Sequence, residues 1–119
     1  MQTPSKPQVD LEHLARYTGG DRALDLEVLR LFVGQSSALI ADMPAALAEA
    51  DGKRWHYISH SLKGAARGIG AFALADLAAA AESLDLDCEP SKAKDMHGQL
   101  QESLEAVHAF IRAFEAETA

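Results

Sequence analysis

Residues 55–71 read WHYISHSLKGAARGIGA, and this stretch shows a regular helical pattern. Apolar side chains recur in it every three or four positions, which at about 100° per residue places them on one face of a helix. That apolar stripe consists of Trp55, Ile58, Leu62, Ala65 and Ile69. The sequence therefore predicts a helix that buries this face.

The opposite face of the same helix carries a histidine, a lysine and an arginine at helical spacing. His60, Lys63, Gly64 and Arg67 follow one another at i, i+3, i+4 and i+7, and His56 lies one turn earlier on the same side. We expect these side chains to face solvent. Gly64 is unusual, because glycine inside a helix costs about 0.5–1 kcal/mol relative to alanine, which this chain uses freely. The glycine indicates that space is needed beside His60.

Charge is distributed unevenly along the chain. The whole sequence has a net charge of −7, which argues against general nucleic-acid binding, since that activity needs a basic surface. Residues 53–75 nevertheless contain no Asp or Glu. Their four cations are Lys53, Arg54, Lys63 and Arg67. The sequence therefore predicts a locally basic surface around the histidine.

The stretch HSLKGAARGIGA, followed by Leu74 and Glu82, resembles the signature of histidine-containing phosphotransfer (HPt) domains, roughly HxLKGxxxxxGA. The matching positions are His60, Leu62, Lys63, Gly64, Gly70 and Ala71. The resemblance implies that His60 accepts a phosphoryl group from a receiver-domain aspartate and passes it to another receiver. It also implies that receiver domains and a histidine or hybrid kinase are the partners. Glu82 lies where the family usually places a polar residue near the histidine, so it either orients the His60 ring or is a plain solvated glutamate.

The residue chemistry is compatible with that role. A neutral imidazole is a competent nucleophile, and the ordinary histidine pKa of about 6.5 leaves most of it neutral at cytoplasmic pH. Phosphoryl transfer depends mainly on positioning and charge stabilisation, which Lys63 and Arg67 are spaced to provide beside His60. The bare side of Gly64 would let a partner approach the imidazole.

Other parts of a phosphotransfer enzyme are missing from the sequence. It has no Walker loop, no other glycine-rich phosphate loop and no dense acidic metal cluster beside His60. We therefore expect a phosphoryl carrier rather than an enzyme, with no cofactor of its own. The magnesium ion and most of the catalysis are expected on the partner receiver.

The composition is that of one helical domain. The chain has 119 residues, 48% of them hydrophobic and 24% charged, and its alanine and leucine excess favours helix. Residues 1–8 hold two of the four prolines and are expected to be a disordered lead, and residues 9–119 a single domain. Cys88 is the only cysteine, so a reducing, cytoplasmic location is expected. The sequence contains no uninterrupted apolar run of about 18–20 residues, so it predicts no membrane span. We expect a soluble monomer.

Capping residues and breakers divide the chain into helices. Asp10 can cap a short helix that stops near residues 18–20, and Asp21 can open a long one, in which Pro44 predicts a kink or a division. A break at residues 51–52 precedes the histidine helix.

Two further helices complete the prediction. One spans about residues 72–86, with alanines that allow close packing, and the last is capped by Ser91. The short turns favour antiparallel neighbours. The fold expected is all-α: an antiparallel four-helix bundle in up-down topology with a short extra N-terminal helix.

Three alternative functions are open at this point. An adaptor or inhibitor could bind a receiver or kinase without ever carrying phosphate. The phosphoacceptor segment of a histidine kinase usually has an acidic residue after its histidine and a nearby proline, whereas Ser61, Leu62 and Lys63 follow here. A metal-binding bundle would use His56 and His60, four residues apart, but no third ligand is evident.

Overall fold

The computed structural model describes residues 8–118, which form five α-helices. Their bounds are α1 Leu11–Thr18, α2 Arg22–Ala48, α3 Gly52–Ile69, α4 Phe72–Glu82 and α5 Pro90–Thr118. The described residues contain no strand. The all-α prediction is therefore confirmed.

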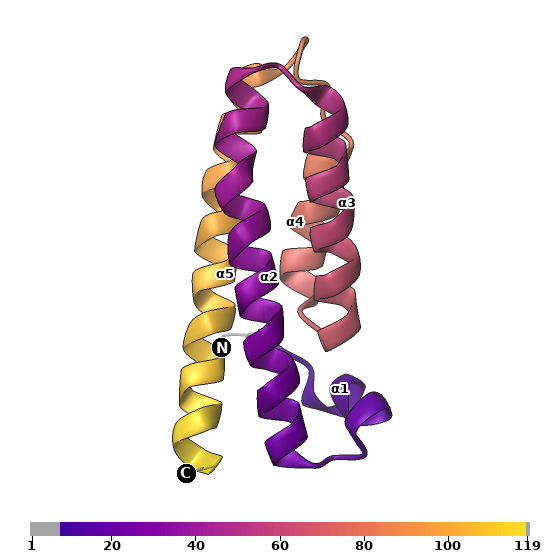
Figure 1. Ribbon diagram of the computed structural model, residues 1–119, viewed down its shortest axis with the longest axis vertical. Helices are drawn as coiled ribbons and strands as arrows, with labels where there is room; N and C mark the ends of the chain where they lie inside the picture. The colour runs from indigo at the N-terminus through magenta and orange to yellow at the C-terminus, as the bar shows by residue number, and fades with distance from the viewer. Residues whose placement is uncertain (1–7, 119) are drawn as a thin grey trace, which may run out of the picture.

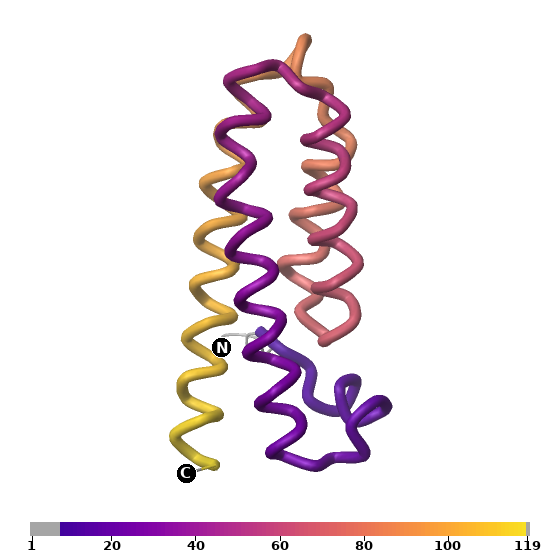
Figure 2. The backbone as a smooth tube through the Cα atoms, in the orientation of Figure 1, coloured from indigo at the N-terminus to yellow at the C-terminus, as the bar shows by residue number. Residues whose placement is uncertain are grey.

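Four of the helices form a bundle with a closed ring of neighbours (Figure 1). α2 packs against α3 and α5, and α4 packs against the same two helices. Successive helices run in opposite directions, which is consistent with the expected up-down order. The tube in Figure 2 shows that α2 and α5 extend beyond the α3–α4 pair, and that α1 lies below that pair. α1 contacts α2 and α3, so it covers one end of the bundle.

The core is built from the apolar stripes of all four long helices. On α3, Trp55, Ile58 and Leu62 are almost completely buried, as their spacing predicts. The Trp55 indole Nε1–H donates a hydrogen bond to the Ala81 carbonyl at 2.8 Å, which ties α3 to α4. The alanines of α4 that face the core are fully buried and let its neighbours approach closely, as expected; they are Ala75, Ala78 and Ala81.

Aspartates cap the first three helices. Asp10, Asp21 and Asp51 each accept backbone N–H groups of the first helical turn through a side-chain oxygen. The helix starts predicted at Asp10 and Asp21 are confirmed, and Asp51, which the sequence marked as a break, caps α3.

Gly70 ends α3 and also holds α1 in place. Its φ of +80° is a left-handed conformation that favours glycine. The Gly70 carbonyl accepts the Asp10 N–H at 3.0 Å. A Cβ at position 70 would lie 2.8 Å from the Asp10 carbonyl oxygen. The approach of the α1 cap therefore requires a glycine here.

Two helix ends differ from the sequence-based prediction. α4 ends at Glu82, not near residue 86, because Asp85 folds the following chain into a turn that accepts the backbone N–H groups of Asp87 and Glu89. The last helix is not capped by Ser91. It begins at Pro90, whose missing N–H and fixed φ suit the first helical position.

The expected disordered lead lies almost wholly outside the described residues, which begin at Gln8. Among the described residues, α2 alone is long and apolar enough to cross a membrane by composition, with a mean hydropathy of 1.3. It is also a bundle helix, in which Leu29, Phe32 and Met43 are buried. Core helices of soluble proteins can have the same length and hydropathy, so these two properties are weak evidence for a membrane span.

Pro44 does not divide α2, which runs unbroken from Arg22 to Ala48. Proline has no N–H, so the Ile40 carbonyl one turn earlier lacks its helical donor. The imidazole of His97 on α5 lies with Nε2 at 3.1 Å from that carbonyl oxygen. Because a carbonyl can only accept, His97 donates the hydrogen bond that Pro44 cannot. α5 thus satisfies the backbone group that the proline leaves free.

This replacement can be tested with a double-mutant cycle. We expect His97→Ala to destabilise the wild-type bundle by about 1–3 kcal/mol, because a buried carbonyl loses its partner. In a Pro44→Ala background the restored N–H satisfies Ile40, so the same substitution should cost clearly less. Urea unfolding measures both, with His108→Ala as a control on α5. Equal costs in the two backgrounds would show that His97 does not serve this carbonyl.

Candidate functional site

His60 lies in the middle of α3 with most of its ring in solvent. Its side chain is 65% exposed, and Nδ1 is 2.7 Å from Oε2 of Glu82. A carboxylate can only accept, so Nδ1 carries the proton and donates it in this hydrogen bond. The lone pair is then on Nε2, which has no hydrogen-bond partner among the described residues. An exposed, unprotonated ring nitrogen is the form in which histidine acts as a nucleophile.

Glu82, the last residue of α4, holds both His60 and Lys63. Its side chain is 14% exposed, and Oε1 accepts a hydrogen bond from the Lys63 ammonium while Oε2 accepts one from His60. The bond from Lys63, and then the bond from His60, hold the pKa of the Glu82 carboxyl below its ordinary value, against the opposite effect of burial. The carboxylate is therefore charged at neutral pH. The sequence left open whether Glu82 contacts the histidine or is a plain solvated glutamate, and in the structure it contacts the histidine.

Lys63 does not extend into solvent as its helical position predicted. Its side chain is only 19% exposed, because Glu82 draws the ammonium against α4. The surface around His60 is thus less basic than the sequence indicates. Arg54 is also neutralised, by Asp42 and Glu49 of the preceding segment. The carboxylates that pair with these cations lie outside residues 53–75.

The other two cations of that stretch have different surroundings. Lys53 and Arg67 lie on the exposed surface of α3. Within residues 8–118, neither forms an ion pair with a carboxylate. Lys63 is paired with Glu82, so Arg67, two turns from His60, is the cation of the predicted site that has no carboxylate partner within residues 8–118.

Gly64 is exposed, and a Cβ built on it would meet nothing within 4 Å. Space inside this protein therefore does not require the glycine. By helical geometry Gly64 lies about 40° around α3 from His60, on the side away from Glu82 and Lys63. The backbone at Gly64 therefore lies bare between the imidazole and the next face of the helix.

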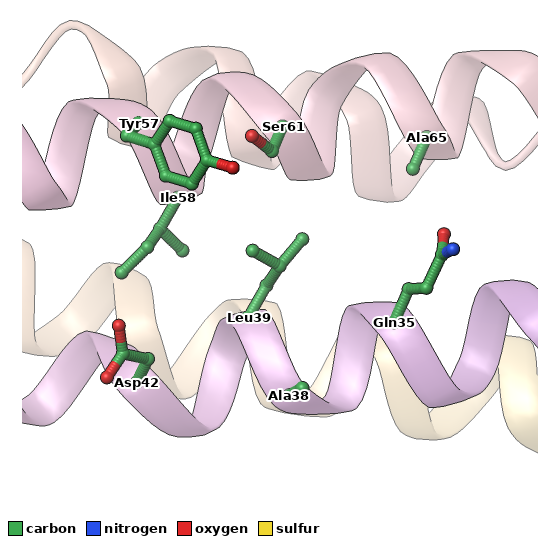
Figure 3. Close-up of a pocket in the computed structure, with 8 residues that line it drawn as sticks. All are labelled: Gln35, Ala38, Leu39, Asp42, Tyr57, Ile58, Ser61 and Ala65. Atoms are coloured by element: carbon green, nitrogen blue, oxygen red, sulfur yellow. The ribbon is translucent and has the colours of Figure 1, made fainter.

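An open groove lies on that next face, between α2 and α3 (Figure 3). In the close-up, Ile58 and Ala65 point from α3 toward α2, from which Leu39 and Gln35 project. The Tyr57 ring and Ser61 lie along the α3 side. The remaining lining residues are Ala38 and Asp42. Most of these side chains are apolar or aromatic, and the Tyr57 residue is 66% exposed. The groove is a mostly apolar surface beside the exposed imidazole of His60.

The structure differs in one detail from the apolar stripe predicted for α3, and the groove includes residues of α2 that the sequence did not single out. Ala65 is partly buried at the groove, and Ala66 occupies the fully buried core position instead. The sequence did not show which residues form the α2 side of the groove, because the apolar residues of this helix are spread over more than one face. Which of its faces lies beside α3 depends on the packing.

The remaining reactive groups do not form a second site. Cys88 is an exposed thiol whose pKa is raised by hydrogen bonding to Asp85 and by the nearby charges of Asp87 and Glu89, which makes it a poorer nucleophile. In the described part of the chain, no group of three His, Cys, Asp or Glu side chains is arranged to hold a metal ion. His60 is an exposed imidazole whose Nδ1 is held by a carboxylate.

Comparisons with known proteins agree with this geometry. The family model of the Hpt domain matches residues 27–110. The fold is similar to the crystal structure of histidine-containing phosphotransfer protein B (HptB) from Pseudomonas aeruginosa PAO1, with a TM-score of 0.81 and 24% sequence identity over 94% of this chain and 98% of that one. At that identity the likeness shows the fold alone. No curated protein sequence matches the chain.

The Glu82 carboxylate predicts a specific dependence of stability on pH. A carboxyl with a lowered pKa contributes stability that is present above its ordinary value of 4.5 and lost as the pH falls through its folded-state pKa. We therefore expect the stability difference between wild type and Glu82→Gln to change in favour of the variant below about pH 5. Urea unfolding at several pH values measures it. The exposed Glu102→Gln on α5 is the control, and identical pH profiles for all three proteins would contradict the prediction.

Proposed function

Since this chain belongs to the family of Hpt domains, whose members are phosphoryl carriers of phosphorelays, we propose that it carries its phosphoryl group on Nε2 of His60. The donor is the aspartyl phosphate of a receiver domain, and the acceptor is the aspartate of another receiver. One observation carries the assignment: Glu82 binds Nδ1–H of His60, which leaves the Nε2 lone pair on an exposed surface. The other ring nitrogen is occupied and cannot attack.

The transfer step needs little from this chain beyond that arrangement. The Nε2 lone pair attacks the phosphorus atom, an N–P bond forms, and the P–O bond to the receiver aspartate breaks. The aspartate leaves as a carboxylate, and the Nδ1 proton stays with the ring. The ring gains positive character as the N–P bond forms, and the Glu82 carboxylate, already hydrogen-bonded to Nδ1, stabilises it.

Charge around the phosphoryl oxygens comes from both proteins. The Arg67 guanidinium is free to bind them, and the Lys63 ammonium has three donors, so it can contact a phosphoryl oxygen while it remains bound to Glu82. This chain offers no carboxylate cluster for a divalent ion in its described part. We expect the magnesium ion to be held by the acidic residues of the receiver.

The groove between α2 and α3 is the proposed docking surface for the receiver. It presents the apolar side chains of Ala38 and Leu39 and the exposed ring of Tyr57, and apolar and aromatic residues are the kinds that form the centre of protein interfaces. A partner seated there reaches His60 across Gly64, where no side chain blocks it. The cytoplasmic location and the monomeric state stay predictions of the same proposal.

The direct test is a phosphotransfer assay with His60→Gln. Purified wild-type protein, incubated with a phosphorylated receiver or hybrid kinase, should acquire an acid-labile, base-stable phosphate, and the variant should acquire none. Because the side chain is 65% exposed, the variant should keep its helical circular dichroism and unfolding midpoint. Phosphate that persists in the variant would place the acceptor elsewhere. Receivers that bind without loading either protein would favour an adaptor.

Gly64 gives a second test, in which stability and transfer should change in opposite directions. Gly64→Gln adds a helix-favouring residue in open space, so it should stabilise the bundle by about 0.5–1 kcal/mol. The new side chain stands between His60 and the groove, so transfer from the receiver should slow by about tenfold or more. Gly98→Gln on α5 is the matched control, with similar open space and no expected effect on transfer. Unchanged transfer in Gly64→Gln would contradict the steric role.

A further inference from the structure

A second imidazole lies against the same carboxylate as His60. The rings of His56 and His60 are nearly parallel, with an interplanar angle of 9° and centroids 6.2 Å apart. Nε2 of His56 is 3.6 Å from Oε2 of Glu82, the oxygen that accepts the hydrogen bond from His60. The His56 side chain is 62% exposed, so it can exchange protons with water. The transfer step described above gives it no role.

The charges around His56 are few and of both signs. On its own helix, Lys53 lies one turn before it and Lys63 lies two turns after it, bound to Glu82. From α4, Glu82 is the only carboxylate in the described residues that comes within ion-pair distance of its ring. That carboxylate is already engaged by His60 and Lys63. A new negative charge nearby would therefore change the proton affinity of His56 appreciably.

A phosphoryl group on His60 would be such a charge. It brings roughly two negative charges near neutral pH, and a neighbouring ring at this separation lies within about one Debye length, ~8 Å at physiological salt. An imidazole is the side chain whose protonation responds to such a change near neutral pH. Protonated His56 would then carry a positive charge near both the phosphoryl group and Glu82.

We infer that His56 is the proton-linked partner of the phosphoryl group: it takes up a proton from solvent when Nε2 of His60 is phosphorylated, and it releases the proton when the group leaves. The inference rests on the proposed function, because it concerns the phosphorylated state of the same site. In the balanced step, the N–P bond forms, the P–O bond breaks and Nδ1–H stays on His60, so the additional proton comes from water. No electron transfer is involved.

Linkage makes this uptake visible in the transfer equilibrium. If the phosphoryl group raises the affinity of His56 for a proton by a given factor, protonation of His56 raises the affinity of His60 for the phosphoryl group by the same factor. Lower pH would then shift phosphate from the receiver onto this protein. His56 acts on the equilibrium through charge and does not touch the reacting atoms before transfer, so it is a positioning residue.

The experiment is an NMR titration of the histidine rings with and without phosphate on His60. Long-range ¹H–¹⁵N spectra follow each imidazole between about pH 5 and pH 9, and potassium phosphoramidate serves as the phosphate donor. We expect the titration midpoint of His56 to rise by about half a pH unit in the phosphorylated protein. His108, on α5 and outside the site, is the internal reference and should not move.

The outcomes separate this inference from the proposed function. If His60 is phosphorylated and the His56 midpoint stays in place or falls, the inference is wrong and the carrier function stands. If His60 accepts no phosphate from phosphoramidate or from a receiver, both are wrong. A rise confined to His56 supports the inference, whereas an equal rise in His108 would show a general charge effect and would overturn it.

A variant gives an independent readout. Lowering the pH should shift the equilibrium from phosphorylated receiver toward phosphorylated His60. We expect the equilibrium constant to change by about threefold more in wild type than in His56→Gln. The titrations of the receiver, of His60 and of the phosphoryl group are common to both proteins, so the difference isolates position 56. His108→Gln should behave as wild type. The same pH dependence in wild type and His56→Gln would contradict a proton-linked role.

Discussion

The Glu82 carboxylate, largely buried between α3 and α4, is the interaction on which the reactive surface depends. It accepts hydrogen bonds from Lys63 and His60 through its two oxygens, so one charge fixes a tautomer and neutralises a cation. Its partners lie on a different helix, and the contact exists only when α3 and α4 pack in the observed register. That register is set by apolar contacts and by the bond from Trp55 to the Ala81 carbonyl, one residue before Glu82. The chemistry of the imidazole is therefore tied directly to the core.

Three faces of α3 have different surroundings. One face enters the core, a second meets Glu82, and a third forms the groove with α2, while His60 stands between the last two. This arrangement places the exposed imidazole beside the apolar groove without exposing the core. Gly64 separates them with the least possible bulk. A helix suits this design because residues one or two positions apart in sequence point in different directions.

Several irregular positions show how local needs are met by distant residues. Gly64 and Gly70 belong to the same signature, but for different physical reasons: Gly64 leaves an outer surface bare, and Gly70 admits the α1 cap in a left-handed conformation. Pro44 removes a donor from α2, and His97 of α5 supplies one. For Gly70 and Pro44 the sequence marks the position, and the reason for the residue is found in a neighbouring element.

The sequence alone determined the features that depend on local periodicity and local hydrogen bonds. These are the apolar stripe of α3, the aspartate caps and the exposure of His60 and Gly64, because each follows from spacing along one helix. It could not determine the contact of Glu82 with His60, 22 positions away, or the burial of Lys63 that results. The groove was also decided by the tertiary structure. The physical reason is that rotation and register between helices are set by side chains from the whole core, and no single segment contains that information.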